Sequence, residues 1–313
     1  MDVYSLEYGC PLTEPQLNVY LDIVANEKVD AYLIRLFMDI SKDYGVDKIM
    51  DALDEMFRVH PILGMCVSDE FDVPYLVKGS KPEILVESDA GEEFVKEFLT
   101  KPFDLHDCLS RFLIVENEYG YRLYGVFHHI IFDALSDGVF KQDLQAILDG
   151  KSVDTDDSFL KVSAFNQQIK ENDDFVEADK FYESLLVDSD DAGSLLDSVV
   201  SDGPGSIHID LDLDLDLFNS FIDDYGISEN IVFTSAFAYT LSRFAGNDKV
   251  LFNMAENGRD RFNNLNSIGM FVNTLPLLVD CKNQDVSSFI GDISSLIYDV
   301  MRYNYYQFRL LAN

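Results

Sequence analysis

Basic residues are scarce in this sequence of 313 residues. Lysine and arginine together number 23, whereas aspartate and glutamate number 57, so the formal net charge at pH 7 is −34. Proteins that bind nucleic acid or an anionic membrane surface need a basic patch, so this balance argues against both kinds of partner. The acidity itself is typical of a solvated surface and indicates no particular chemistry.

Cysteines and long apolar runs are also sparse. The four cysteines are scattered and form no Cys-x-x-Cys pair and no Cys/His cluster; they are Cys10, Cys66, Cys108 and Cys281. We therefore expect no metal site and no disulfide framework, and reduced thiols in the cytoplasm fit better. No stretch approaches 18 uninterrupted apolar residues, and the N-terminus lacks the basic start and apolar core of a signal peptide. These features predict a cytoplasmic protein without a membrane span.

Two common catalytic signatures are missing. Ser136 has no Gly-x-Ser-x-Gly context, which argues against a serine triad. No glycine-rich loop follows a strand, as it would in a phosphate-binding site. The sequence instead offers two adjacent histidines, His128 and His129, with Asp133 four positions after the second.

Local pattern predicts that a β-hairpin delivers this histidine pair. Residues 112–115 and 121–127 are strand-like and flank a turn at 117–120, and residues 135–148 are typical of an amphipathic helix. Groups at such a strand end are exposed on rigid support. A neutral imidazole there can accept a proton from an attacking amine or hydroxyl, although an isolated His-His pair is also compatible with core packing or a chance surface position. Asp133 could orient a ring or pair with a buried arginine.

The length of the chain favours two domains or subdomains. A polar stretch rich in Asp, Ser and Gly, at 187–205, is the predicted linker between a first subdomain at 1–186 and a second at 206–313. In the second part, strict alternation predicts a strand at 207–213. A helix at 231–244 is apolar nearly all round and is expected to be buried, and residues 270–279 are expected to form a strand.

The histidine pair belongs to a longer motif. Residues 128–134, His-His-Ile-Ile-Phe-Asp-Ala, resemble the His-His-x-x-x-Asp-Gly signature of nonribosomal peptide synthetase condensation domains, which belong to the chloramphenicol acetyltransferase superfamily. Four further elements resemble family motifs in the family's order: Leu-Thr-Glu-Pro-Gln at 12–16, a degenerate Arg-His element at 58–63, Pro-Phe-Asp-Leu at 102–105 and Gly-Met-Phe-Val-Asn-Thr at 269–274. The sequence is therefore identified as a member of this family.

The resemblance implies a fold and an activity. The fold would be α/β, an α+β sandwich, with two chloramphenicol acetyltransferase-like subdomains in a V-shaped pseudo-dimer. The activity would be that of an acyltransferase, in which a carrier-bound aminoacyl amine attacks a carrier-bound or CoA acyl thioester to form an amide. The domain would bind no cofactor or metal directly, because phosphopantetheine arrives on donor and acceptor peptidyl carrier domains. A downstream adenylation domain is expected in the full-length protein.

The resemblance also implies roles for single residues. His129 would be the catalytic residue that positions or deprotonates the attacking amine, and His128 would be structural or would line the substrate tunnel. Asp133 would stabilise the loop through an ion pair. Arg259 is the expected partner, with a surface position as the alternative for that arginine.

Three more residues would line the substrate tunnel: Ala134, Phe271 and Asn273. For the last two, an ordinary strand is the alternative interpretation. Ala134 replaces the glycine of the signature; its methyl group could narrow the acceptor tunnel, or be tolerated where φ is negative. Family members extend farther beyond the Phe-Val-Asn-Thr element, so we expect an incomplete second subdomain and no activity from this chain alone.

Two other functions share these motifs. An epimerisation domain carries the same His-His signature, but the continuation Asn273-Thr274-Leu275-Pro276 favours condensation. A catalytically inactive carrier-docking platform is the second alternative. Such relatives usually lose the histidine, whereas both histidines are present here.

Overall fold

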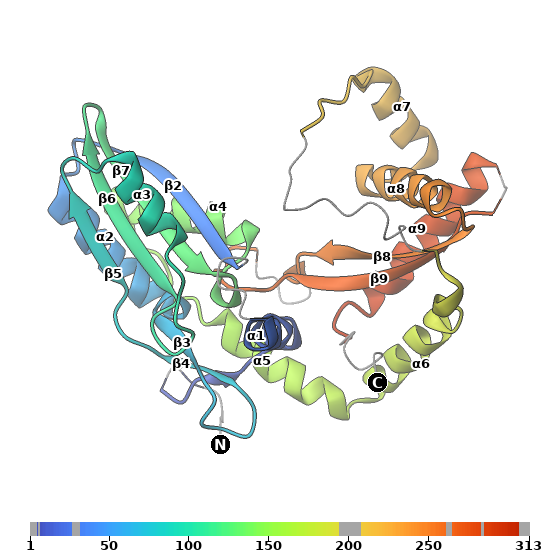
Figure 1. The fold of residues 1–313 in the computed structure, drawn as a ribbon, viewed down its shortest axis with the longest axis horizontal. Helices are drawn as coiled ribbons and strands as arrows, with labels where there is room; N and C mark the ends of the chain where they lie inside the picture. The colour runs from blue at the N-terminus through green and yellow to red at the C-terminus, as the bar shows by residue number, and fades with distance from the viewer. Residues whose placement is uncertain are drawn as a thin grey trace. The chain divides into compact units, whose positions relative to one another are not determined.

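The computed structural model describes residues 5, 7–26, 32–193, 208–260, 265–282 and 285–306. The chain contains both helices and strands in a mixed α/β fold, which confirms the predicted fold class (Figure 1). Contacts divide the chain into two compact units. Unit 1 comprises Met1–Asn172 and Asn257–Asn273, and unit 2 comprises Asp173–Glu256 and Thr274–Asn313. The predicted linker at 187–205 stays a prediction, because residues 194–205 lie outside the described ones.

Unit 1 holds two sheets, one with strand order β2-β7-β6-β5 and one with order β1-β4-β3. The strands are β1 (Cys10–Pro11), β2 (Leu33–Ser41), β3 (Met65–Ser68), β4 (Tyr75–Lys78), β5 (Glu83–Glu87), β6 (Ser110–Asn117) and β7 (Gly120–His128). The helices are α1 (Glu14–Asn26), α2 (Val46–Val59), α3 (Glu92–Thr100), α4 (Ala134–Leu148) and α5 (Ser158–Gln168). Short 3-10 turns are η1 (Pro61–Gly64), η2 (His129–Ile131) and η3 (Ile169–Glu171).

The predicted hairpin forms the centre of the larger sheet. β6 and β7 pair antiparallel, from Ser110 opposite Phe127 to Asn117 opposite Gly120. On its other side β7 pairs antiparallel with β2, and β5 runs parallel to β6. The carboxyl end of β7, which carries the histidine pair, is therefore fixed between two neighbouring strands.

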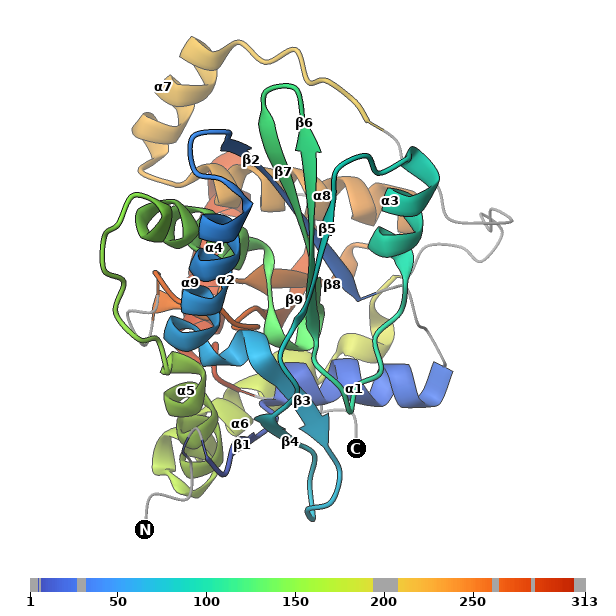
Figure 2. The same cartoon turned by 90° about the vertical axis from the view of Figure 1, so that its left-hand side faces the viewer.

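Helices cover both faces of this sheet. Because side chains alternate along a strand, Phe112 and Ile114 of β6 join the main core with α2 and α4, whereas Leu113 packs with Phe98 of α3. α2 and α4 lie side by side on their face (Figure 2). The apolar stripe of α2 explains this position, since its buried residues recur at helical spacing.

Unit 2 is built from α6 (Asp173–Leu186), η4 (Ser189–Asp191), α7 (Leu215–Tyr225), α8 (Glu229–Ala245), β8 (Lys249–Glu256), β9 (Asn273–Asp280) and α9 (Val286–Arg302). β8 and β9 form a two-stranded sheet. Leu275, Leu277 and Val279 alternate along β9 and share one face, which packs in one cluster with Ile293 and Val300 of α9. Among the described residues, no helix is both long enough and apolar enough to cross a membrane.

The strand predicted at 207–213 is wrong for the residues that the structure describes. Residue 207 lies outside them, and 208–213 belong to no strand and are exposed to solvent. A half-buried strand is stabilised by cross-strand partners and by an apolar surface beneath it. Alternating Asp and Leu residues without such a surface do not form one.

The helix expected to be buried, at 231–244, falls within α8 and is largely exposed. Its buried residues are the small ones: Ser235, Ala238 and Ser242. Phe237 and Phe244 have exposed fractions of 54% and 74%. The expectation of a buried helix was therefore wrong, since only the face with these three small residues is covered.

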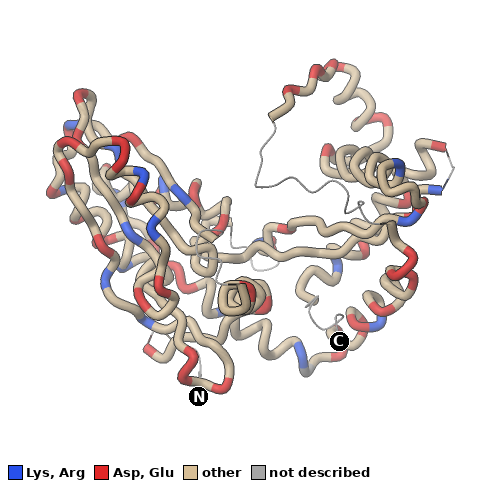
Figure 3. The backbone as a smooth tube through the Cα atoms, viewed as in Figure 1, with Lys and Arg blue, Asp and Glu red and all other residues tan. Residues whose placement is uncertain are grey.

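Charged residues are spread along both units, and acidic ones dominate (Figure 3). Most ion pairs among the described residues are exposed, such as Arg122 with Asp39, whose side chains are 48% and 67% exposed. Pairs of this kind contribute at most about 1 kcal/mol to stability. By contrast, Arg259 and Asp133 in unit 1 form a pair in which the side chains are 1% and 4% exposed.

Candidate active site

The histidine pair lies where β7 ends and the η2 turn begins. The N–H of His128 donates to the carbonyl of Leu109 over 2.9 Å. The N–H of His129 donates to the carbonyl of Tyr32 over 2.8 Å. Because Leu109 precedes β6 and Tyr32 precedes β2, both sheet neighbours hold the backbone of the pair.

His128 is buried, with 4% of its surface exposed. Its Nδ1 atom accepts the N–H of Ile130 over 3.2 Å, and the rings of Tyr32 and Phe103 pack against it at 6.2 Å between ring centroids. Burial, and then the charge of the neighbouring His129, lower the pKa of His128 to about 4. His128 is therefore neutral near pH 7, with one ring nitrogen committed to the backbone.

His129 differs from its neighbour, because its side chain is half-buried. Its Nδ1 atom is buried and has no hydrogen-bond partner among the described residues. Nε2 also makes no hydrogen bond to another described residue, but it is not buried in the way that Nδ1 is. The structure does not bring Asp133 to this ring: no hydrogen bond joins the two within the described part of the chain.

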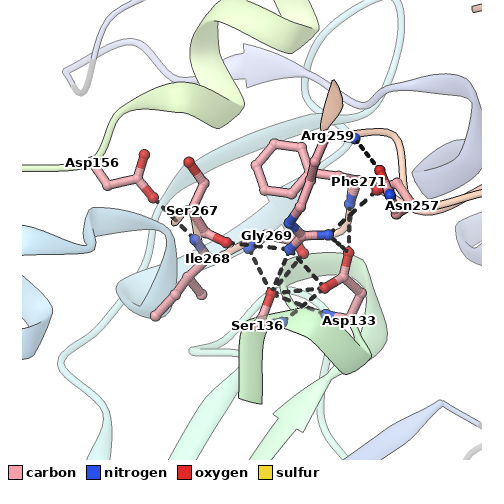
Figure 4. A network of polar contacts seen from close by, with 9 residues as sticks. All are labelled: Asp133, Ser136, Asp156, Asn257, Arg259, Ser267, Ile268, Gly269 and Phe271. Carbon is pink, nitrogen blue, oxygen red and sulfur yellow. Dashed lines mark hydrogen bonds and ion pairs between the residues drawn. The ribbon is translucent and has the colours of Figure 1, made fainter. Parts of the chain in front are cut away.

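Asp133 instead caps the N-terminus of α4 and binds Arg259 (Figure 4). Arg259 Nη1 donates to Oδ2 over 2.6 Å, and Nη2 donates to Oδ1 over 2.8 Å. The N–H of Ser136 donates to Oδ1 and the N–H of Phe271 to Oδ2, each over 3.1 Å. Four donors fill the lone pairs of one carboxylate. Asp133 thus has no acceptor capacity left for a catalytic partner.

The hydroxyl of Ser136 completes this network. Its oxygen accepts the N–H of Gly269 and the Nη2 of Arg259, each over 3.1 Å. Its single proton has two acceptors within reach, the carbonyl of Gly269 at 3.0 Å and Asp133 Oδ1 at 2.9 Å. Since Asp133 is already saturated, the Gly269 carbonyl is the acceptor that leaves every group satisfied.

The segment before β9 is not a strand, although the sequence predicted one from residue 270. The N–H of Ile268 donates to Asp156 over 3.0 Å, that of Gly269 to Ser136 and that of Phe271 to Asp133. Because side chains take these N–H groups, they are unavailable to a strand ladder. β9 therefore begins at Asn273.

Phe271 and Gly258 shape the surroundings of Arg259. Phe271 is 6% exposed, and its ring packs over the Arg259 guanidinium at 4.6 Å, a cation–π contact. Gly258 has φ of +67°, and a Cβ atom there would lie 1.8 Å from the carbonyl oxygen of Phe271. Only glycine fits this position.

The degenerate second element contributes a buried histidine, His60, between two carboxylates. Its Nε2 lies 2.8 Å from Asp143 Oδ2, and its Nδ1 lies 3.5 Å from Asp156 Oδ2 without hydrogen-bond geometry. Burial alone would lower the pKa of His60, but the two aspartates outweigh it and the pKa is raised. Asp156 also binds Ile268, so this element supports the segment that contacts Asp133.

The other expected tunnel residues lie at element ends. Ala134 is the exposed first residue of α4, and Asn273 is the half-buried first residue of β9. Helical backbone has negative φ, so the methyl group of Ala134 introduces no backbone strain. The roles of Ala134, Phe271 and Asn273 in a substrate tunnel stay predictions.

Sequence reasoning missed three residues of the site: Ser136, Asp156 and Gly258. An Asp-x-x-Ser pattern before a predicted helix is a capping signal that could have identified Ser136. Asp156 lies in a polar loop, and nothing local distinguishes it from the other acids. The described residues contain no group of three His, Cys, Asp or Glu side chains that could hold a metal ion.

Comparison with known proteins gives one family. The condensation domain model matches residues 7–313. Bacitracin synthase 3 of Bacillus licheniformis is 23% identical over 317 residues, which cover 94% of this chain and 5% of that protein. The chain therefore spans only a small part of this relative's length.

Solved structures share the fold at low identity. The first condensation domain of the calcium-dependent antibiotic synthetase matches with a TM-score of 0.73 and 18% identity, over 96% of this chain and 76% of that one. The epimerization domain from the third module of tyrocidine synthetase B matches with a TM-score of 0.73 and 14% identity, over 96% and 75%. Since the family model covers nearly the whole sequence, the chain belongs to the condensation domain family.

Proposed function

We propose that this domain forms an amide bond between two thioester-bound substrates, with His129 as the residue that touches the reacting atoms. The observation that carries the proposal is the difference within the histidine pair. His128 is buried and neutral, and its Nδ1 binds Ile130, whereas His129 is half-buried on a fixed turn and its Nε2 makes no hydrogen bond to another described residue.

In the proposed reaction, the α-amine of an acceptor aminoacyl thioester attacks the carbonyl carbon of a donor acyl thioester. The new C–N bond forms, the C–S bond breaks, and the proton lost by the amine ends on the departing thiol. Phosphopantetheine arms of donor and acceptor carrier domains would deliver both substrates, with a downstream adenylation domain loading the acceptor. Holding both reactants together can supply much of the rate. We place the reaction in the cytoplasm, where the free cysteines stay reduced.

The proton of the neutral His129 ring lies on Nδ1 or on Nε2. Nδ1 is buried without a partner, so either form leaves it unsatisfied, at a cost of about 1–3 kcal/mol. The form with its proton on Nε2 presents a donor to the substrates. We therefore propose that His129 contributes mainly by donating a hydrogen bond to the oxygen that becomes negative when the amine attacks.

Epimerisation is the second candidate, because an epimerization domain matches the fold with the same TM-score as a condensation domain. Both reactions are measured with the full-length synthetase and loaded carriers. Amide product is followed by mass spectrometry, and exchange of the substrate α-proton is followed in deuterated water. Amide without α-proton exchange supports condensation, and the reverse result supports epimerisation. A protein that binds carriers but does neither is a docking platform, which overturns the proposal.

Two substitutions separate the possible roles of His129. His129→Ala should lower amide formation by about 10²–10³-fold, the usual loss when one donor to a developing oxyanion is removed. His129→Gln places an amide donor near the position of Nε2 and should retain part of the activity. If His129→Gln is as inactive as His129→Ala, the result favours a role of His129 as a general base. The exposed His208, replaced in His208→Ala, serves as the matched control with unchanged rate.

A further inference from the structure

The side chain of Gln16 joins the start of α1 to the turn that carries His129. Gln16 is buried, with 4% of its surface exposed. Its Oε1 accepts the N–H of Thr13 over 2.8 Å and the hydroxyl of Thr13 over 3.0 Å. Its Nε2 donates to the carbonyl of Ile130 over 2.8 Å, across 114 residues of sequence. One amide group therefore serves both a helix start and the turn.

The η2 turn has its other backbone groups fixed by neighbours. The N–H groups of His128 and His129 bind carbonyls that precede β6 and β2, and the N–H of Ile130 binds His128 Nδ1. The N–H of Phe132 closes the turn on the carbonyl of His129. The carbonyl of Ile130 points the other way and receives the Gln16 amide. Without Gln16, this acceptor would be buried and unsatisfied.

We propose that Gln16 is a positioning residue for His129, an inference that rests on the proposed function of that histidine. Without the Gln16 donor, the peptide after Ile130 can rotate so that the Ile130 carbonyl reaches another hydrogen-bond donor. Ile130 follows His129 directly, so the turn that carries His129 loses one of its fixed backbone contacts and Nε2 is free to shift. Displacement of a reacting group by about 1 Å can lower a rate by about 10²-fold.

A purely structural role would be to cap α1. The two roles use different ends of the same amide, which allows them to be separated. Gln16→Glu keeps oxygens that accept the Thr13 N–H, as glutamate does in a capping box, but loses the donor to Ile130. Gln16→Met loses both ends at similar size. Thr13→Val removes the hydroxyl contact and leaves the Gln16–Ile130 bond, so it is the matched control.

Amide formation is measured for these variants in the full-length protein, with kcat and KM determined per folded molecule from thermal unfolding curves. Gln16→Glu and Gln16→Met should each lower kcat by about ten-fold or more, with KM changed less than about two-fold. Thr13→Val should keep the wild-type kcat. A Gln16→Glu variant with wild-type kcat would show that Gln16 only caps the helix, and the inference would be overturned.

Hydrogen–deuterium exchange gives a readout that does not depend on activity. Gln16→Met should increase exchange at the amides of His129 and Phe132 by about ten-fold, with no change in the β6–β7 hairpin. Unchanged exchange at these two amides overturns the inference even in a protein without activity. A wild-type protein that forms no amide, together with faster exchange in Gln16→Met, would reject the proposed function and retain the role of Gln16 in holding the turn.

Discussion

Asp133 and Arg259 are 126 residues apart in the sequence, and two hydrogen bonds of 2.6 and 2.8 Å join their side chains in a buried ion pair. The pair fixes the start of α4 to the segment before β9. Its hydrogen bonds to Ser136 and Phe271 satisfy the remaining lone pairs of the carboxylate. The acid of the signature therefore stabilises the site and is not available as a proton acceptor.

Arg259→Met is expected to lower the free energy of unfolding by about 3–5 kcal/mol, because it leaves the Asp133 charge buried without its counter-charge. Denaturant unfolding measures this change. The exposed pair of Arg122 and Asp39 is also joined by two hydrogen bonds, from Nε and Nη2 over 2.7 and 2.8 Å, and is the matched control. Arg122→Met should cost less than about 1 kcal/mol. Equal losses for the two variants would contradict the importance of burial.

His60 should make the free energy of unfolding decrease as the pH rises above neutral. Its folded pKa is raised by Asp143 and Asp156 despite burial, so the folded state binds a proton that the unfolded state releases above about pH 6.5. The resulting stability is complete below that pH and is lost as pH rises through the folded pKa. His60→Gln should remove this slope, which is at most about 1.4 kcal/mol per pH unit. If the free energy of unfolding changes with pH by the same amount in the wild type and in His60→Gln between pH 6 and 9, His60 is not charged in the folded state.

His128 should act in the opposite direction, at acid pH. The pKa of His128 is lowered to about 4 in the folded state. Below about pH 6.5 the unfolded state therefore binds a proton that the folded state does not bind. Stability then falls as pH decreases from about 6.5 toward 4. His128→Asn keeps an acceptor for the Ile130 N–H but does not titrate, so it should lose less stability over this range. Denaturant unfolding at pH 7, 6 and 5 compares the two, and an equal loss would refute a neutral, buried His128.

Ala134→Gly is expected to lower the free energy of unfolding by about 0.5–1 kcal/mol, because glycine loses more conformational freedom in a helix and relieves no strain here. Gly138 lies in the same helix, and a Cβ atom added there would meet no described atom within 4 Å apart from its own helix and chain neighbours. Gly138→Ala should therefore raise stability by a similar amount. Denaturant unfolding measures both. A more stable Ala134→Gly variant would mean that the backbone of residue 134 is not helical.

Local sequence patterns predicted secondary structure correctly where the stabilising interactions lie between residues close in sequence. The β6–β7 hairpin and α4 follow from alternating and helical apolar spacing, and the Thr13–Gln16 capping pattern was visible in four residues. The prediction failed where a segment depends on distant partners. Residues 208–213 alternate like a strand but have no strand partner among the described residues, and residues 270–272 lie in a segment whose backbone binds side chains elsewhere in the fold.

The amino-acid sequence was enough to identify the family, the position of the histidine pair after a strand and the candidate pairing of Asp133 with Arg259. Which other groups meet became visible only in the folded chain: Ser136 with Gly269, Asp156 with Ile268, and Gln16 with Ile130. The physical reason is the difference in range. Helix, hairpin and cap signals arise from residues within a few positions of each other, whereas a buried polar group must find a partner wherever the folded chain brings one within hydrogen-bond distance.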